Sequence, residues 1–202
     1  MARTIRIYSL VDVDRSGKVR WTACELDYEI EESRISIEDM RGEAYRHINP
    51  YAQVPSATID GETLVESAAI CICLAERHPE AGLIPEGGQQ RRKFWQDLNL
   101  INATLELPTV NYFLAKRGVI DEHWAELVGE QVKSRLETFA SRLPQDDYLA
   151  GTFSLADIFA AYVLRIAVQA ELLPYEGRLA DYMDRLRARP AAVASRIFDS
   201  LT

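Results

Sequence analysis

Apolar and polar residues follow two different spacings along the chain, and the change falls near residue 80. Before it, short apolar runs bounded by turn residues predict strands that are separated by helices. The predicted elements run in the order strand from 5, helix 19–26, strand 27–30, helix 40–48, strands 56–59 and 63–65, and helix 67–78. The turn Asp60-Gly61 between the last two strands is typical of a hairpin. The pattern therefore predicts two strand–helix units, then a hairpin and a helix.

This order of elements is the layout of a thioredoxin-like α/β domain, which we place at residues 1–80. Two prolines and three glycines lie within residues 79–88, so we place a linker at 81–88. After the linker no convincing strand pattern follows and helical spacing dominates. This predicts an all-α domain over residues 89–202.

The second domain is predicted to contain two long helices, a buried central helix and a final helix, over 91–115, 122–143, 154–170 and 181–189. Pro108 is expected to disturb the first of them. The segment 154–170 is apolar nearly all round, which is typical of a buried helix. Ser154 and Asp157 have the spacing of a capping box at its start. We interpret this feature as structural rather than catalytic.

The composition narrows the class of partner. The chain has 202 residues and 48% hydrophobic content, enough for one or two domains with sizeable cores. Its formal charge of -8 argues against a nucleic-acid or anionic-membrane partner, because both require a basic face. No segment approaches the roughly 18 unbroken apolar residues of a membrane span, and the N-terminus lacks the apolar run of a signal peptide. We therefore expect a cytoplasmic protein.

The cysteines and histidines indicate no metal. Cys24, Cys71 and Cys73 are an odd set without CxxC spacing, so they predict neither a disulfide framework nor a zinc site. The three histidines are scattered and form no ligand pattern. We therefore assign no metal ligands.

The most informative motif is Gln53-Val54-Pro55 before the hairpin, together with Glu66-Ser67 at the start of the next helix. A cis X-Pro bond here would leave the N–H and C=O of Val54 free to pair with an extended ligand. The N–H groups at the helix start carry a positive dipole end and can hold a carboxylate, while Glu66 takes an ammonium. The chemistry that fits both is recognition of a small peptide with an amino-acid head group.

The motif Asn-Pro-x-x-Gln-Val-Pro followed by Glu-Ser resembles the glutathione site of the glutathione S-transferase family. The resemblance implies an α/β thioredoxin-like N-terminal domain and an all-α C-terminal domain, and glutathione as co-substrate without a metal. It also implies an apolar electrophilic small molecule as second substrate and a homodimer. In the site, Gln53, Val54 and Pro55 would hold the cysteinyl and glycyl backbone of glutathione. Glu66 with Ser67 would hold its γ-glutamyl head.

Catalysis in this family depends on a group between the first strand and first helix that stabilises the thiolate, because a free thiol titrates near about 8.5. The segment resembles the zeta class in Tyr-Ser at its start and Ser-x-Lys-Val-Arg at its end. This alignment places Val13 at the catalytic serine position, and valine has no hydroxyl. Three alternatives stay open: the hydroxyl of Tyr8, the hydroxyl of Ser16, and backbone N–H groups around 13–15. For Ser16, a role as helix cap is the competing interpretation.

The acidic residues Asp12 and Asp14 would raise the thiol pKa, with Arg15 and Lys18 as compensation. We therefore expect weak conjugating activity or a different glutathione chemistry. The favoured reaction is attack of the thiolate on an electrophilic small molecule. The alternatives are a glutathione-dependent disulfide reductase or isomerase, and a non-catalytic interaction module of the same fold. Val13 favours the last alternative, whereas the intact glutathione motif opposes it.

Overall fold

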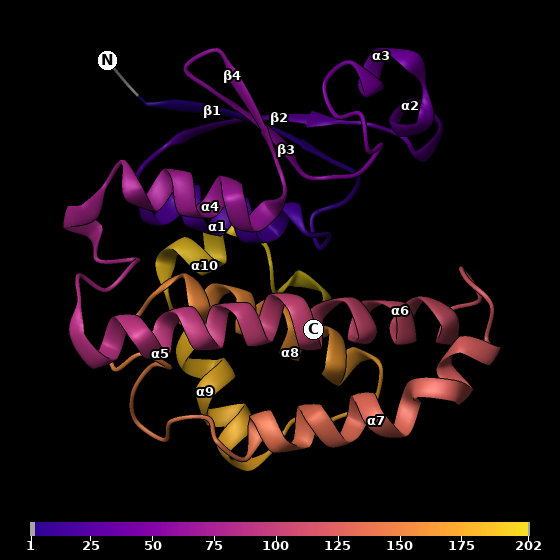
Figure 1. The fold of residues 1–202 in the computed structure, drawn as a ribbon, viewed down its shortest axis with the longest axis vertical. Helices are drawn as coiled ribbons and strands as arrows, with labels where there is room; N and C mark the ends of the chain where they lie inside the picture. Colours follow the sequence, from indigo (N-terminus) through magenta and orange to yellow (C-terminus); the bar gives the residue numbers. More distant parts are fainter. Residues whose placement is uncertain (1–2, 202) are drawn as a thin grey trace. The chain divides into compact units, whose positions relative to one another are not determined.

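The structure, a computed structural model, describes residues 3–201, so residues 1–2 of the predicted first domain lie outside it. The chain forms two compact units (Figure 1). The first consists of residues 3–84 together with Arg189–Ser200, and the second of Pro85–Ala188. The predicted fold class is confirmed: a mixed sheet with helices is followed by an all-helical part.

The first unit is built on a four-stranded sheet. Its strands are β1 (Thr4–Ser9), β2 (Glu29–Arg34), β3 (Ser56–Ile59) and β4 (Glu62–Val65), in the order β2-β1-β3-β4. β1 is parallel to β2 and antiparallel to β3, and β3 and β4 form the predicted hairpin. Alternation along β1 buries Ile5 and Ile7 on one face of the sheet.

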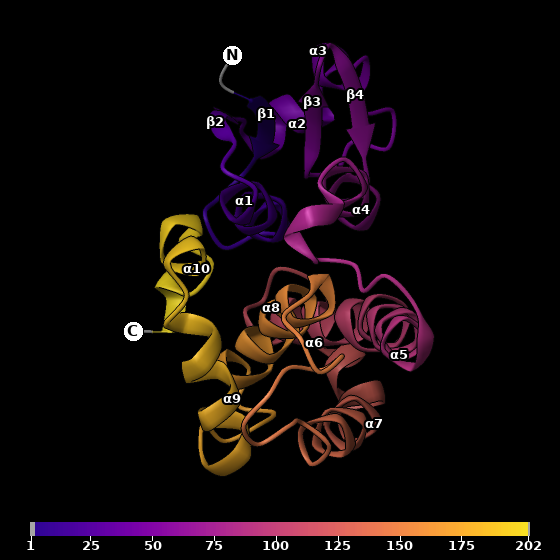
Figure 2. The same ribbon diagram turned by 90° about the vertical axis from the view of Figure 1, so that its left-hand side faces the viewer.

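Two helices cover this buried face (Figure 2). The helical elements of the unit are α1 (Ser16–Glu25), α2 (Ile37–Arg41), α3 (Glu43–Arg46), α4 (Ser67–Glu76), η1 (Pro79–Ala81), α10 (Pro190–Ser195) and η3 (Asp199–Leu201). α1 and α4 contact each other and the sheet, and Val19, Ile70 and Leu74 are fully buried there. Burial of these side chains supplies roughly 1.5–3 kcal/mol each relative to exposure.

Three elements in this unit differ from the predicted ones by more than two residues or by a break in the helix. α1 begins at Ser16 rather than at residue 19, and β2 extends to Arg34 rather than ending at residue 30. The extension of β2 follows from pairing with β1, since the added residues are polar and show no apolar alternation. The predicted helix 40–48 divides into α2 and α3 because Gly42 adopts an extended backbone, with φ −70° and ψ 161°.

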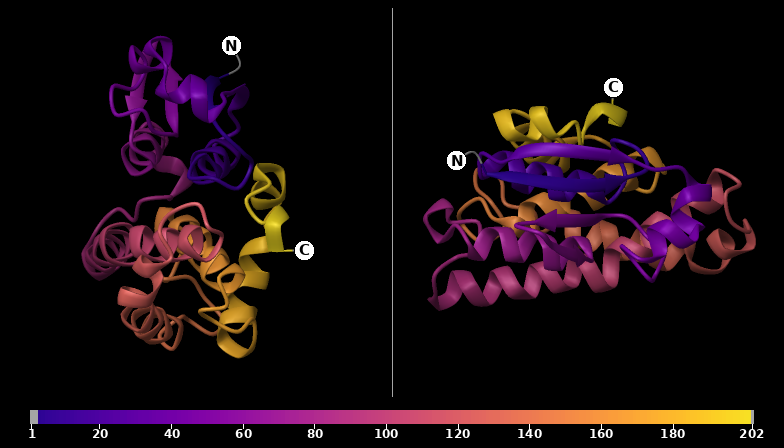
Figure 3. Two further views of the ribbon diagram at one scale, coloured as in Figure 1. Left: turned by 90° about the vertical axis from the view of Figure 1, so that its right-hand side faces the viewer. Right: turned by 90° about the horizontal axis from the view of Figure 1, so that it is seen from above.

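The C-terminal segment Arg189–Ser200 packs with the first unit, although the predicted boundary placed it in the helical domain. α10 lies beside α1, as the yellow helix shows in Figure 3. The Phe198 ring packs edge-on against the Trp21 ring, with the ring centroids 5.7 Å apart. A Cβ on Gly17 would lie 3.1 Å from Ile197 Cγ1, so this glycine allows the segment to approach α1 closely.

The second unit is a bundle around a buried helix. Its elements are α5 (Gly88–Asn99), the π-helix η2 (Leu100–Glu106), α6 (Leu107–Lys116), α7 (His123–Ala140), α8 (Leu155–Gln169) and α9 (Gly177–Arg187). α8 is buried from its first residue to Ala167 and contacts α5, η2, α6 and α9. The predicted capping box of Ser154 and Asp157 is confirmed. The predicted disturbance at Pro108 takes the form of the preceding π-helix, because proline offers no backbone N–H to continue the α-helical pattern.

Candidate functional site

The loop between α3 and β3 contains a cis peptide bond between Val54 and Pro55. Pro55 is buried, Val54 is half-buried and Gln53 is exposed. Sheet pairing of β3 begins only at Ser56. The backbone groups of Val54 therefore lie outside the pairing of β3, where an extended ligand can reach them.

Three buried side chains hold this loop in place. The Tyr45 hydroxyl donates to the Gln53 carbonyl oxygen at 2.9 Å and lies 2.8 Å from the Ser56 hydroxyl. The Asn49 side-chain amide donates to the same Gln53 oxygen at 2.8 Å and to Ser56 Oγ at 3.2 Å. Burial raises the pKa of Tyr45, so its hydroxyl stays protonated at neutral pH. The conformation of the residue before Val54 is thus fixed by two separate donors.

We expect Tyr45→Phe to lower the free energy of unfolding by about 1–2 kcal/mol, because the Ser56 hydroxyl and the Gln53 carbonyl each lose a buried partner. Urea denaturation followed by circular dichroism measures the change. The matched control is Tyr51→Phe, which removes a hydroxyl from a side chain that is 71% exposed. Equal stability of the two variants would contradict a supporting role for Tyr45.

The start of α4 lies beside this loop because of the hairpin register. Ser56 of β3 pairs directly with Val65 of β4. The residues that flank this pair, Pro55 and Glu66, therefore lie at the same end of the hairpin. Glu66 is exposed and has φ 68°, a left-handed backbone that turns the chain into α4. Ser67 is the first residue of the helix and is 5% exposed.

Tyr8 lies at the same end of the sheet, since it pairs with Ser56 across β1 and β3. Its ring is tilted against the Tyr45 ring, with the centroids 5.8 Å apart. Tyr8 faces away from the layer formed by α1 and α4, as the alternation with buried Ile7 requires. The structure therefore brings Tyr8, the cis-proline loop and the start of α4 to the same end of the sheet.

Ser16 is the first residue of α1 and does not cap it. It is fully buried, and its hydroxyl accepts a hydrogen bond from Arg20 Nη1 at 3.0 Å. Asp14 organises the start of α1 instead. Its Oδ1 accepts the Ser16 N–H at 2.7 Å, and its Oδ2 accepts the N–H groups of Leu10 at 2.7 Å and Val11 at 3.0 Å. These three donors lie on either side of residues 13–15, the segment whose N–H groups were expected to face a thiolate.

Sequence reasoning missed this role of Asp14, although a signal for it exists. An aspartate just before a helix commonly accepts backbone N–H bonds near the helix start. Val13 is half-buried in the same loop. The residue that resembles the catalytic serine position thus has an apolar side chain next to the carboxylate that holds the loop.

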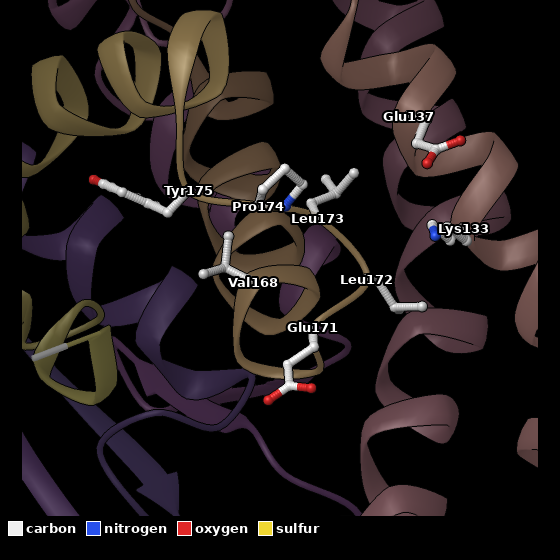
Figure 4. Close-up of a pocket in the computed structure, with 8 residues that line it drawn as sticks. All are labelled: Lys133, Glu137, Val168, Glu171, Leu172, Leu173, Pro174 and Tyr175. Carbon is white, nitrogen blue, oxygen red and sulfur yellow. The ribbon is translucent and has the colours of Figure 1, made fainter.

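The second unit has a separate hollow of about 440 Å³ between α7 and the segment after α8 (Figure 4). On one side it is lined by the segment after α8, with Leu172, Leu173 and Pro174. On the other side it is lined by α7, with Lys133 and Glu137. Its mixture of apolar side chains with both signs of charge defines no single class of ligand. Among residues 3–201, no group of three or more side chains could hold a metal ion, and no helix is long and apolar enough to cross a membrane.

The first unit is a thioredoxin-like domain whose cis-proline loop and α4 start lie at one end of the sheet. Residues 11–82 match the family profile described as "Glutathione S-transferase, N-terminal domain". Glutathione S-transferase GstA of Escherichia coli O157:H7 is 30% identical over 154 residues, which cover 74% of this chain and 75% of that protein. The chain therefore belongs to the glutathione S-transferase family, which uses glutathione as co-substrate, as the motif resemblance predicted.

A second relative has a different activity in its name. "Probable maleylacetoacetate isomerase 1" of Drosophila melanogaster is 29% identical over 163 residues, which cover 75% of this chain. The match spans 64% of that protein, just under two thirds of its length. Among solved structures, poplar glutathione transferase F1 superposes with a TM-score of 0.84 over 100% of both chains at 17% identity, which shows a shared fold.

Proposed function

We propose that the protein binds glutathione between the cis-proline loop and the start of α4, at one end of the sheet, and directs the thiol at an electrophilic small molecule. The observation that carries the proposal is the pairing of Ser56 with Val65. This pairing brings the two halves of the motif to the same end of the hairpin. The family's use of glutathione as co-substrate supports the same ligand.

Each part of glutathione has a proposed partner. The backbone of Val54 pairs with the cysteinyl unit as an added strand would, and Gln53 contacts the glycyl end. The exposed Glu66 carboxylate takes the ammonium of the γ-glutamyl head. The Ser67 hydroxyl and the first N–H groups of α4 take its carboxylate. α4 has 10 residues, long enough for its aligned peptide dipoles to favour an anion at this end.

Tyr8 is the hydroxyl that we propose to meet the thiol. It lies at the same end of the sheet as the cis-proline loop, and its side chain is half-buried. Ser16 is less suited, since its buried hydroxyl already binds Arg20. Backbone N–H groups around residues 13–15 stay the third alternative, while the N–H of Ser16 at the start of α1 already donates to Asp14. Weak activation of the thiol is consistent with this arrangement.

Isothermal titration calorimetry tests the binding step. We expect reduced glutathione and S-methylglutathione both to bind with micromolar to low millimolar affinity, because the proposed contacts to the peptide backbone and the γ-glutamyl head do not involve the sulfur. If the titrations of both ligands gave only the heat of dilution, with no saturation, the proposal would be wrong. The protein would then be a non-catalytic module of this fold, the alternative that Val13 favours.

Isomerisation is the second candidate reaction, and the relative named as an isomerase favours it. In that reaction the thiol adds to a conjugated double bond and is expelled after rotation, so glutathione is recovered. Product analysis distinguishes the reactions. A thioether adduct supports conjugation, a rearranged substrate with unchanged glutathione supports isomerisation, and oxidised glutathione supports disulfide reduction. The homodimer, which the family resemblance implies, and the cytoplasmic location, which the apolar pattern of the sequence favours, stay predictions.

A further inference from the structure

A cluster of five charged side chains surrounds the loop between β1 and α1. We call it the loop charge cluster, and it consists of Asp12, Arg20, Glu32, Arg34 and Arg196. Its members come from the loop itself, α1, β2 and the segment after α10. All five belong to the first unit.

Two arginines bind the carboxylate of Asp12. Arg34 forms an ion pair with Asp12 Oδ1, and Arg196 Nη2 lies 3.0 Å from the same oxygen. Arg20 binds the loop at a different atom, because its Nη2 donates to the backbone carbonyl of Asp12. The acidic side chain next to Val13 is therefore compensated by two cations and fixed through its backbone by a third.

Glu32 holds the same arginines from the other side. Its Oε1 accepts from Arg20 Nη1 and from the Ser9 hydroxyl at 2.9 Å, and lies 3.3 Å from Arg34. Its Oε2 accepts from Arg196 at 3.0 Å. Burial lowers the pKa of Arg20, and the carboxylates of Glu32 and Asp14 oppose that shift, so the guanidinium stays charged at neutral pH.

The loop charge cluster and Asp14 together carry equal numbers of positive and negative charges. Three arginines face the carboxylates of Asp12 and Glu32, and Asp14 supplies a third negative charge within the loop. Removing one charge therefore leaves a net charge in the loop that follows β1, the strand that carries Tyr8. Arg196 is half-exposed, so its removal opens no large cavity.

We propose that Arg34 and Arg196 are positioning residues that offset Asp12, and that the C-terminal segment thereby sets the ionisation of the glutathione thiol. This inference rests on the proposed function. It explains how a segment with two aspartates near the sulfur can still serve a thiol. It also gives Arg196 a role that its distance from the motif in sequence conceals.

The expected size of the effect follows from Coulomb's law. A unit charge roughly 10 Å from the sulfur, at an effective dielectric constant of about 40, shifts a thiol pKa by roughly half a unit. Asp12→Asn leaves a net positive charge and should lower the pKa of bound glutathione by about that amount. Arg196→Gln leaves a net negative charge and should raise it by a similar amount.

The experiment is a titration of thiolate absorbance in the glutathione complex of each full-length variant. The variants are Asp12→Asn, Arg196→Gln and the double variant, in which the pKa should return close to the wild-type value. Arg135→Gln, which removes an exposed arginine from α7 in the second unit, is the control and should leave the pKa unchanged. Binding of S-methylglutathione shows that each variant keeps its fold and site.

The outcomes separate this inference from the proposed function. Shifts of opposite sign in the two single variants support the inference, and a merely structural role would not produce them. An unchanged thiol pKa in both, with S-methylglutathione still bound, overturns the inference and leaves the proposed function standing. If Arg196→Gln does not fold, the sign of the shift in Asp12→Asn decides. If the wild type binds neither ligand, the proposed function fails and the inference with it.

Discussion

Replacing Asp157 with alanine is expected to lower the free energy of unfolding by about 3–5 kcal/mol, the largest single effect that we predict. The carboxylate is fully buried at the start of α8. Its Oδ1 accepts from the Leu149 N–H at 2.9 Å and the Tyr182 hydroxyl at 2.7 Å. Its Oδ2 accepts from the Ser154 N–H at 2.9 Å and Oγ at 3.0 Å. Alanine leaves all these donors buried without their acceptor.

Urea denaturation of the full chain, followed by tryptophan fluorescence, measures this loss. The control is Asp146→Ala, which removes an exposed carboxylate from the preceding loop and should change stability by less than about 0.5 kcal/mol. A loss below about 1 kcal/mol for Asp157→Ala would show that the donors find other acceptors or water. In that case the buried start of α8 would not depend on its capping box.

The same carboxylate gives a pH dependence whose sign follows from its environment. Burial raises the pKa of Asp157 above its ordinary value, and its hydrogen bonds oppose the shift. A raised pKa in the folded state means that the folded protein binds the proton more tightly. The titration of Asp157 therefore favours folding most below the unfolded pKa, and this contribution fades as pH rises through the folded pKa. The variant Asp157→Asn should lack this contribution.

Replacing Ser67 with alanine is expected to weaken binding of S-methylglutathione by about 1–2 kcal/mol, or roughly 5- to 30-fold. In the proposed function, its hydroxyl meets the carboxylate of the γ-glutamyl head, and alanine removes that charge-assisted hydrogen bond. The substitution adds no bulk at the first position of α4, so the helix is expected to keep its place. Calorimetry with S-methylglutathione isolates binding from any change in the thiol.

Ser134→Ala is the matched control, because Ser134 is an exposed serine on α7 in the second unit. Its affinity should equal that of the wild type. Unchanged affinity in Ser67→Ala would remove this residue from the site and leave the head group to Glu66 and the helix N–H groups. A drop in melting temperature without a drop in affinity would show that Ser67 only supports α4.

Local signals carried the parts of the site that could be predicted from the sequence. The turn Asp60-Gly61 predicts the hairpin, and the hairpin brings Pro55 and Glu66 to one end. The capping box of α8 is readable for the same reason, since its partners are three residues apart. In each case, residues close in sequence determine a contact that positions the rest.

The remainder depends on contacts that no local pattern encodes. Arg196 donates a hydrogen bond to Glu32, which lies 164 residues away in the sequence. No motif in the sequence around either residue predicts this contact. The polar end of β2 is a strand only because β1 pairs with it. Serine is a common helix cap, but the hydroxyl of Ser16 binds Arg20 instead. The carboxylate of Asp14 accepts the backbone N–H at the start of α1.

The return of residues 189–200 to the first unit affects the order in which the chain folds during synthesis. The surface of α1 around Trp21 is covered by this last segment, so it stays open while the whole second unit leaves the ribosome. At about 5–20 residues per second, that interval lasts several seconds. The thioredoxin-like domain is thus translated before the helical unit and completed after it, and the apolar surface around Trp21 stays uncovered during the interval.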